Sequence, residues 1–98
     1  MDITEDEMEK VRSPYFSQWL CKQKRATKFK WKDMANHLGI STQGVDNYAK
    51  GFSHPQCMKL YRLCEFIAIH TNKSTEVVWY EALKPIIKDY NHKQGKKT

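Results

Sequence analysis

The sequence has few residues that interrupt helices and few patterns that build sheets. Its 98 residues include only four glycines and three prolines, and no segment alternates apolar and polar residues as half-buried strands do. Asn-Gly and Asp-Gly pairs, which often join the two strands of a hairpin, do not occur. We therefore predict an all-α fold, a compact bundle of about five helices around one core.

Long apolar runs and the residue patterns of common enzymes are also missing. No stretch approaches the roughly 20 apolar residues that span a bilayer, and the start lacks a basic region followed by an apolar run. Cys21, Cys57 and Cys64 form no CxxC pair or Cys/His quartet, no histidine belongs to a nucleophile and base pattern, and no GxxxxGK phosphate loop occurs. We expect a cytoplasmic protein with reduced thiols, no metal, no cofactor, no membrane contact and no enzymatic activity.

Positive charge is the feature that the composition has in excess. The chain has 17 Lys and Arg residues against 11 Asp and Glu, and the acidic residues crowd the first nine positions, so the remainder is more basic still. Phosphate contacts release counterions and raise affinity, so this balance favours a polyanionic partner. Ribosomal and membrane-surface proteins share the balance, which therefore does not decide the function.

The distribution of residues divides the chain into four parts. Residues 1–12 form an acidic N-terminal arm, residues 13–73 a helical domain, residues 74–91 a C-terminal helical segment, and residues 92–98 a basic tail. Ser13 before Pro14 favours a helix start, because serine can cap free amide groups and proline fits the first turn. Pro85 is expected to kink the last helix or to divide it.

The centre of the chain has the signals of two short helices joined by a tight turn. One helix is predicted over residues 31–38, where Gly39 supplies the left-handed residue that ends it. The next is predicted over residues 42–50, with Ser41 as its cap and Gly51 at its end. A strongly apolar segment over residues 58–68, from Met58 through Tyr61 to Ala68, predicts the central helix of the bundle. The apolar residues expected to face inward from the two short helices and their turn are Met34, Ala35, Leu38, Ile40, Val45, Tyr48 and Ala49.

The stretch FKWKDMANHLGISTQGVDNYAKG, followed by HPQCMKLYRLCEFI, resembles the phage repressor and Cro family of DNA-binding domains over about residues 15–70. The shared features are a small residue early in the first motif helix, a turn glycine, a glycine after the second motif helix and a proline before the next helix. In this sequence they are Ala35, Gly39, Gly51 and Pro55. The family has a helix-turn-helix, whose second helix enters the major groove of DNA.

The resemblance implies a set of base-reading side chains on the helix over residues 42–50. Gln43 and Asn47 lie four residues apart on one helix face, and amide side chains can bridge the N6 and N7 edge of adenine. Asp46 would be repelled by phosphates unless it accepts a hydrogen bond from cytosine. The alternative interpretation is a solvated polar helix face. The predicted base-reading residues are Thr42, Gln43, Asp46, Asn47 and Lys50.

The same resemblance implies contacts to the DNA backbone from a basic run over residues 22–32, which would position the protein without specifying sequence. Trp31 stands where the family often has a polar residue, so its indole either donates to phosphate or packs against Phe29 or the first helix. Gly44, inside the second motif helix, either lets the backbone approach DNA or is simply tolerated. The predicted backbone contacts are Lys28, Lys30, Trp31, Lys32 and Ser41.

The C-terminal helical segment is more apolar than one stripe against a core requires, and such an excess often marks an interface. Helix-turn-helix proteins commonly bind near-palindromic sites as two copies, so a homodimer is expected. The alternative is that these residues complete the core of a single chain. The predicted dimerisation residues are Val78, Trp79, Leu83, Ile86 and Ile87.

The predicted function is that of a sequence-specific transcription regulator, a repressor of phage or mobile-element type. Its partner would be double-stranded DNA, at the nucleoid of a bacterial or phage-infected cell. The alternative is a protein-interaction module on the same fold, such as an antitoxin, antirepressor or adaptor, with a protein partner. A nonspecific or RNA-binding basic protein is a third interpretation, which would tolerate changes at Gln43 and Asn47 but not at Lys28 or Lys30.

Overall fold

The computed structural model describes residues 11–95, in which every regular element is a helix. The helices are α2 (Pro14–Thr27), α3 (Trp31–Leu38), α4 (Thr42–Lys50), α5 (Cys57–Thr71) and α6 (Thr75–Gly95). The prediction of an all-α bundle is therefore confirmed for the described residues. The predicted acidic arm up to residue 10, and the side chains of Lys93, Lys96 and Lys97 in the predicted tail, lie outside what the structure describes.

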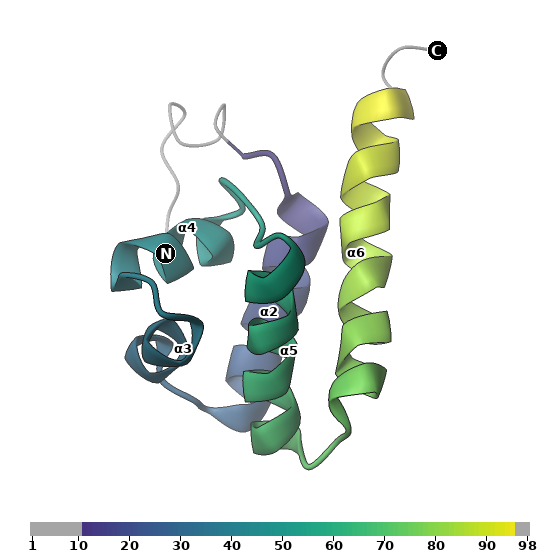
Figure 1. Cartoon of the computed structure of the whole chain (residues 1–98). Coiled ribbons are helices and arrows are strands. Elements are labelled where there is room, and N and C mark those ends of the chain that lie inside the picture. Colours follow the sequence, from purple (N-terminus) through teal and green to yellow (C-terminus); the bar gives the residue numbers. More distant parts are fainter. Residues whose placement is uncertain (1–10, 96–98) are drawn as a thin grey trace.

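The central helix of the bundle is α5 (Figure 1). It contacts α2, α3 and α6. In the view of Figure 1, α2 lies behind α5, α3 and α4 lie on one side, and α6 runs along the other. Because α6 contacts α2 and α5 but neither α3 nor α4, the molecule has two sides that are separated by one core. The residues that α5 contributes to this core are Leu60, Leu63, Cys64, Phe66, Ile67 and Ala68.

Residues with positive φ end each of the first four described helices. Gly39 (φ 72°) follows α3 and Gly51 (φ 82°) follows α4, as predicted from the sequence. Lys28 (φ 58°) ends α2 and Asn72 (φ 59°) ends α5 in the same left-handed conformation. Because glycine adopts this conformation without steric cost, the two corners around α4 are specified locally. Both α3 and α4 accordingly have the bounds that the sequence predicts.

The start of α2 is held by a residue from the last helix rather than by its own serine. The carboxylate of Asp89 accepts hydrogen bonds from the backbone amides of Tyr15 (2.8 Å) and Phe16 (3.0 Å). Ser13 makes no capping bond, and its hydroxyl lies 3.1 Å from Nδ1 of His54. The capping prediction for Ser13 is therefore wrong. Asp89, which is only 4% exposed, satisfies first-turn amides that would otherwise lack a partner.

The last helix, α6, runs through Pro85 without a break. The prediction that Pro85 could divide this segment is therefore wrong. A proline inside a helix loses one backbone hydrogen bond, but α6 packs against α2 and α5 on both sides of the proline, with Ala82 and Asp89 buried. The helix also continues to Gly95, beyond the boundary predicted at residue 91.

The core contains most of the residues that were predicted to face inward. On α3 and α4 these buried residues are Met34, Ala35, Leu38, Val45 and Tyr48. Two of the apolar residues by which the central helix was predicted face solvent, because Met58 is 66% exposed and Tyr61 is 42% exposed. Helix α5 has neighbours that cover only part of its circumference, so some of its apolar residues face solvent.

Candidate nucleic-acid interface

A tight corner joins α3 to α4. The backbone amide of Ile40 donates a hydrogen bond to the carbonyl oxygen of Ala35 at 3.1 Å, and the side chain of Ile40 packs against the core. A Cβ atom at position 44 would lie 3.1 Å from Cδ1 of Ile40. Gly44 therefore lies against the isoleucine that fills the corner, a contact that neither sequence interpretation included, and a larger residue at position 44 would require Ile40 to shift by a few tenths of an ångström.

Helix α4 has one face in the core and the other face in solvent. Val45 is fully buried and Tyr48 is 9% exposed, and burial raises the pKa of the Tyr48 hydroxyl above its ordinary value. The Ser41 hydroxyl accepts a hydrogen bond from the backbone amide of Gly44 at 3.2 Å, which confirms the predicted cap. These contacts fix which side of α4 points away from the protein.

The C-terminal end of α4 is bound to α2. The Ser17 hydroxyl and the Cys21 thiol both donate to the carbonyl oxygen of Ala49, the thiol at 3.6 Å. The carbonyl oxygen of Gly51 accepts the backbone amide of Ser13 at 2.8 Å. A Cβ atom at Gly51 would lie 3.2 Å from the carbonyl oxygen of Ser13. Both ends of α4 are thus held, one by its cap and the other by α2.

The residues predicted to read bases share the outward surface of α4. Thr42 and Gln43 are exposed, whereas Asp46, Asn47 and Lys50 are half-buried. The Nε2 group of Gln43 donates to Oδ1 of Asn47 at 3.1 Å, and Nζ of Lys50 lies 3.2 Å from Oδ2 of Asp46. The amide pair leaves the oxygen of Gln43 and the amino group of Asn47 available. One acceptor and one donor is the combination that the N6 and N7 edge of adenine complements.

Trp31 lies at the start of α3, beside the outward surface of α4. Its half-buried indole packs edge-on against Phe29, with the ring centroids 5.4 Å apart. The ammonium group of Lys24 lies 5.5 Å from the indole centroid, a contact that no sequence signal could reveal because the two residues belong to different helices. An open hollow of about 330 Å³ is lined by Trp31, Thr42, Gln43 and Asp46. Trp31 therefore packs against Phe29 and also borders the predicted base-reading residues.

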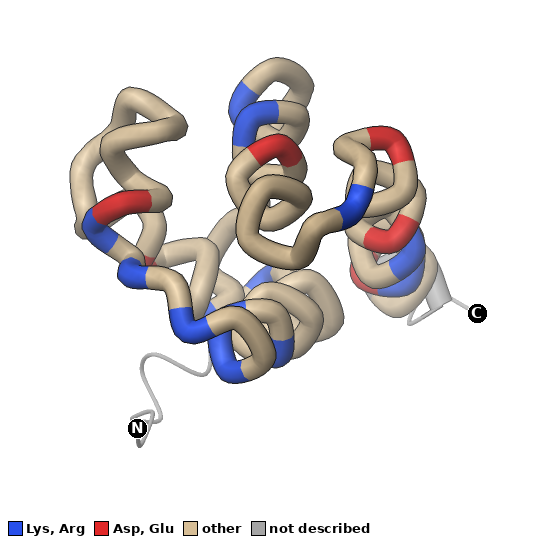
Figure 2. Tube along the Cα trace, turned by 90° about the horizontal axis from the view of Figure 1, so that it is seen from below, with Lys and Arg blue, Asp and Glu red and all other residues tan. Residues whose placement is uncertain are grey.

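Lysines follow the connection from α2 into α3 (Figure 2). Lys28, Lys30 and Lys32 are exposed, and so is Ser41 at the start of α4. Within residues 11–95, none of these three lysines has a carboxylate within 4.0 Å of its ammonium group. Their charges are available to an anion without breaking an ion pair, and they lie on the same side of the core as α4.

The residues predicted for dimerisation do not form one exposed surface. Val78 is fully buried, so it cannot contact a second chain without unfolding the core, and its assignment is wrong. Trp79, Leu83 and Ile86 pack half-buried against the same core, while Ile87 is 54% exposed. Large exposed residues on α6 that were not among the five are Val77, Tyr80 and Tyr90.

Within the described part of the chain, no group of His, Cys, Asp and Glu side chains is placed to hold a metal ion. No described helix combines the length and apolar content that crossing a membrane requires. Comparison of the chain with models of protein families, with curated proteins and with solved structures finds no match.

Proposed function

We propose that the chain binds double-stranded DNA sequence-specifically through a helix-turn-helix of the phage repressor type, formed by α3 and α4. In this geometry α4 enters the major groove and α3 crosses the phosphate backbone. The observation that carries the proposal is the amide pair of Gln43 and Asn47, which lies on the outward face of a helix whose opposite face is buried at Val45 and Tyr48. A helix held in this way can lie along base edges without rearrangement of the fold.

Each outward residue of α4 has a chemical role in this proposal. The paired amides of Gln43 and Asn47 recognise an adenine through one acceptor and one donor. Lys50 contacts a guanine or a phosphate, and Asp46 accepts from a cytosine amino group. Because Asp46 and Lys50 are paired in the free protein, DNA contact by either group must compensate for the loss of that pair. Thr42 offers a methyl group to thymine or its hydroxyl to phosphate.

The connection between α2 and α3 supplies phosphate contacts. Lys28, Lys30 and Lys32 are exposed along the connection from α2 into α3, and each phosphate contact to a lysine releases counterions from the duplex. Trp31 borders the hollow next to Thr42 and Gln43, where it limits how closely a sugar or a base can approach. These contacts position α4 and contribute affinity that falls steeply with salt.

Two copies acting together would read both halves of a near-palindromic site. The surface that suits their association is the apolar stripe on α6 formed by the exposed residues Tyr80, Ile87 and Tyr90, with half-buried Leu83 between them. Ile87→Lys is expected to convert the dimer to a monomer in sedimentation velocity at micromolar concentration. Ile69→Lys is the matched control, because Ile69 is 70% exposed on α5. If the wild-type chain sediments as a monomer, the proposed dimer is refuted.

The cellular role that fits this binding mode is transcription regulation. A dimer bound across promoter DNA occludes the polymerase, so we propose a repressor of the kind that phages and mobile elements carry, acting in the cytoplasm at the nucleoid. The resemblance of residues 15–70 to that family supports the sign of regulation.

Selection of bound sites from random duplexes tests the proposal. The selected sites are expected to share a near-palindrome that contains a preferred adenine. Gln43→Ala should relax the preference at one position by about 1–3 kcal/mol. Gln56→Ala is the matched control, because Gln56 is also exposed but lies just before α5, and it should leave the preference intact. A wild-type protein that selects no sequence, or equal effects of the two variants, would refute base reading by α4.

A further inference from the structure

A continuous groove runs between α2 and α6. One part, of about 340 Å³, lies near the start of α2, and an adjoining part of about 500 Å³ extends toward its end. The two parts share Trp19, Lys22, Lys84 and Pro85, so they form one open groove, which we call the α2–α6 groove. Along α2 the groove extends from Tyr15 to Ala26, about 16 Å at 1.5 Å per residue. Its length suits a segment of polypeptide.

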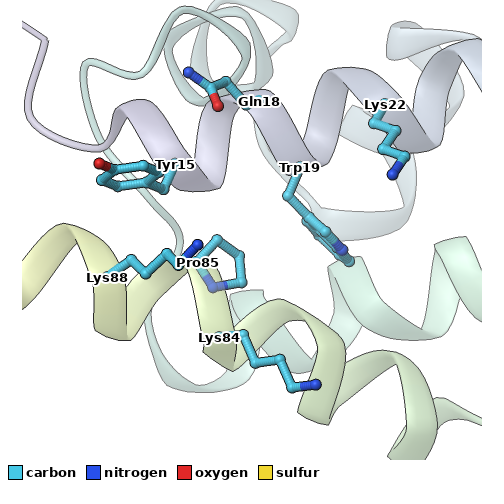
Figure 3. A pocket seen from close by; sticks show the side chains of 7 residues that line it. All are labelled: Tyr15, Gln18, Trp19, Lys22, Lys84, Pro85 and Lys88. Carbon is cyan, nitrogen blue, oxygen red and sulfur yellow. The ribbon is translucent and has the colours of Figure 1, made fainter.

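The floor of the α2–α6 groove is aromatic and apolar (Figure 3). Trp19 packs against Phe16, with ring centroids 5.6 Å apart, and remains half-buried. Figure 3 shows Tyr15 and Trp19 extending from α2 into the space between α2 and α6, where Pro85 lies. Trp and Tyr are among the residues that most often contribute binding energy at protein interfaces. The floor therefore offers a place for one large apolar side chain.

The rims of the α2–α6 groove carry unneutralised positive charge. Lys22 borders it from α2, and Lys84 and Lys88 border it from α6. Among the residues that the structure describes, no carboxylate lies within 4.0 Å of these three ammonium groups. The carboxylate of Glu81 also lines the groove, but it is paired with Lys73 at 3.1 Å. The charge of Lys88 lies 5.5 Å from the ring centroid of Tyr15. Like charges along one groove repel one another, so an anionic occupant would remove an unfavourable interaction.

The α2–α6 groove lies on the flank of α2 that faces away from α4. Ser17 and Cys21 bind the end of α4, whereas Tyr15, Trp19 and Ala26 line the groove on the other flank. Helix α6 contacts neither α3 nor α4. A duplex lying along α4 therefore does not cover the groove. Nucleic-acid phosphates also have no apolar group that could pack against its floor, so DNA is not the expected occupant.

We propose that the α2–α6 groove binds an acidic segment of a partner protein. An aromatic or large aliphatic side chain of that segment contacts Tyr15 and Trp19 above the buried Pro85, and neighbouring carboxylates contact Lys22, Lys84 and Lys88. This second site does not require DNA binding by α4. It would let the chain bind DNA and a protein at the same time, on opposite flanks of α2.

Peptide selection tests the groove directly. Random dodecapeptides displayed on phage are selected against the full chain, and the enriched sequences are synthesised with a fluorescent label for anisotropy. Enriched peptides should combine acidic residues with an aromatic or large aliphatic residue. The double variant Lys22→Glu, Lys84→Glu should weaken their binding at least about tenfold. Lys59→Glu, Arg62→Glu is the matched control, because both residues are exposed on α5 and the net charge changes equally, and it should retain affinity within about twofold.

Several results would overturn the proposal. The proposal is refuted if the enriched peptides lack acidic residues, or if the two double variants lose equal amounts of peptide affinity. Competition between the peptide and a selected DNA duplex would assign the groove to the nucleic-acid interface instead. The triple variant Glu5→Gln, Asp6→Asn, Glu7→Gln tests the chain's own acidic segment as the occupant. If that variant binds the peptide about tenfold more tightly, the chain's own acidic segment competes for the groove. This segment, and not a partner protein, would then be the occupant. Apart from the competition with DNA, none of these readouts depends on whether α4 reads bases.

Discussion

Helices α4 and α6 each bury one face in the same core, but their exposed faces differ in chemistry. The exposed side of α4 carries hydrogen-bonding side chains, including Gln43 and Asn47, and only small apolar groups. The exposed side of α6 carries Tyr80, Ile87 and Tyr90. Hydrogen-bonding groups stay solvated until a partner with matching donors and acceptors replaces water, whereas exposed apolar groups gain from any partner that excludes water. We infer that the α4 side suits base edges and the α6 side suits protein.

The two sides are separated by the residues that α5 buries. Helix α6 has no contact with α3 or α4, so a substitution on one side should leave binding on the other side unchanged as long as the core stays closed.

The largest expected difference is between the reaction rates of two thiols on α5, one in the core and one on the surface. Burial raises the pKa of the Cys64 thiol to about 12, whereas Cys57 is exposed. Because the thiolate is the reactive form, iodoacetamide near pH 8 should alkylate Cys57 about a thousandfold faster than Cys64. Mass spectrometry of peptides from timed reactions measures both rates. Similar rates would mean that the core opens readily and that the two sides are not independent.

A pair of methionines compares the core with the surface. Met34 is fully buried on α3, and Met58 is 66% exposed on α5. Met34→Ala should lower the free energy of unfolding by about 3 kcal/mol, because it leaves a cavity. Met58→Ala should lower it by less than about 0.5 kcal/mol. Urea denaturation measures both values, and a loss at Met58 as large as that at Met34 would contradict the assigned core.

The cap between α6 and α2 is expected to affect stability without affecting DNA binding. Asp89→Ala removes the acceptor of the Tyr15 and Phe16 amides and should cost about 2 kcal/mol in the free energy of unfolding. Ser13→Ala should cost less, since Ser13 makes no capping bond. DNA affinity of Asp89→Ala, measured by anisotropy at a temperature where the protein is folded, should match that of the wild type. A larger loss of stability in Ser13→Ala would contradict the assignment of Asp89 as the main polar contact that holds the start of α2, and would give that role to Ser13 with its contact to His54.

The smallest expected effect concerns a single phosphate contact. Lys32→Ala should reduce the slope of log affinity against log salt by about 0.9 and weaken binding a few-fold at about 0.1 M salt. Lys59→Ala, an equally exposed lysine on α5, should change neither quantity. Anisotropy titrations over a salt series give the slope and the affinity of each variant. Identical slopes for the two variants would show that Lys32 does not contact a phosphate.

The α4 side of the molecule could be predicted from the sequence because its signals are local. Ser41, Gly39 and Gly51 each act within a few residues of their own position, and the bounds of α3 and α4 follow from them. The inward positions of Met34 and Val45 follow from helical spacing. The outward pairing of Gln43 with Asn47 follows from the same spacing, since the two residues lie one turn apart.

The α6 side could not be predicted in this way, because its contacts join distant parts of the chain. Asp89 reaches the start of α2 across more than 70 residues, and no local pattern identifies such a partner. Apolar residues lie around much of the circumference of α6, so spacing alone could not decide that Val78 is buried and Tyr80 exposed. The α2–α6 groove depends on the packing of two helices and has no sequence signature.

The central claim is that the outward face of α4 contacts DNA while the α6 side does not. The most direct measurement is a titration of the isotope-labelled chain with a selected duplex, followed by NMR. The side-chain amide signals of Gln43 and Asn47 should shift strongly and the amide signals of Lys28, Lys30 and Lys32 should shift with them, while the signals of Lys84 and Lys88 stay in place. Shifts confined to α6 and the α2–α6 groove, with α4 unchanged, would contradict the claim.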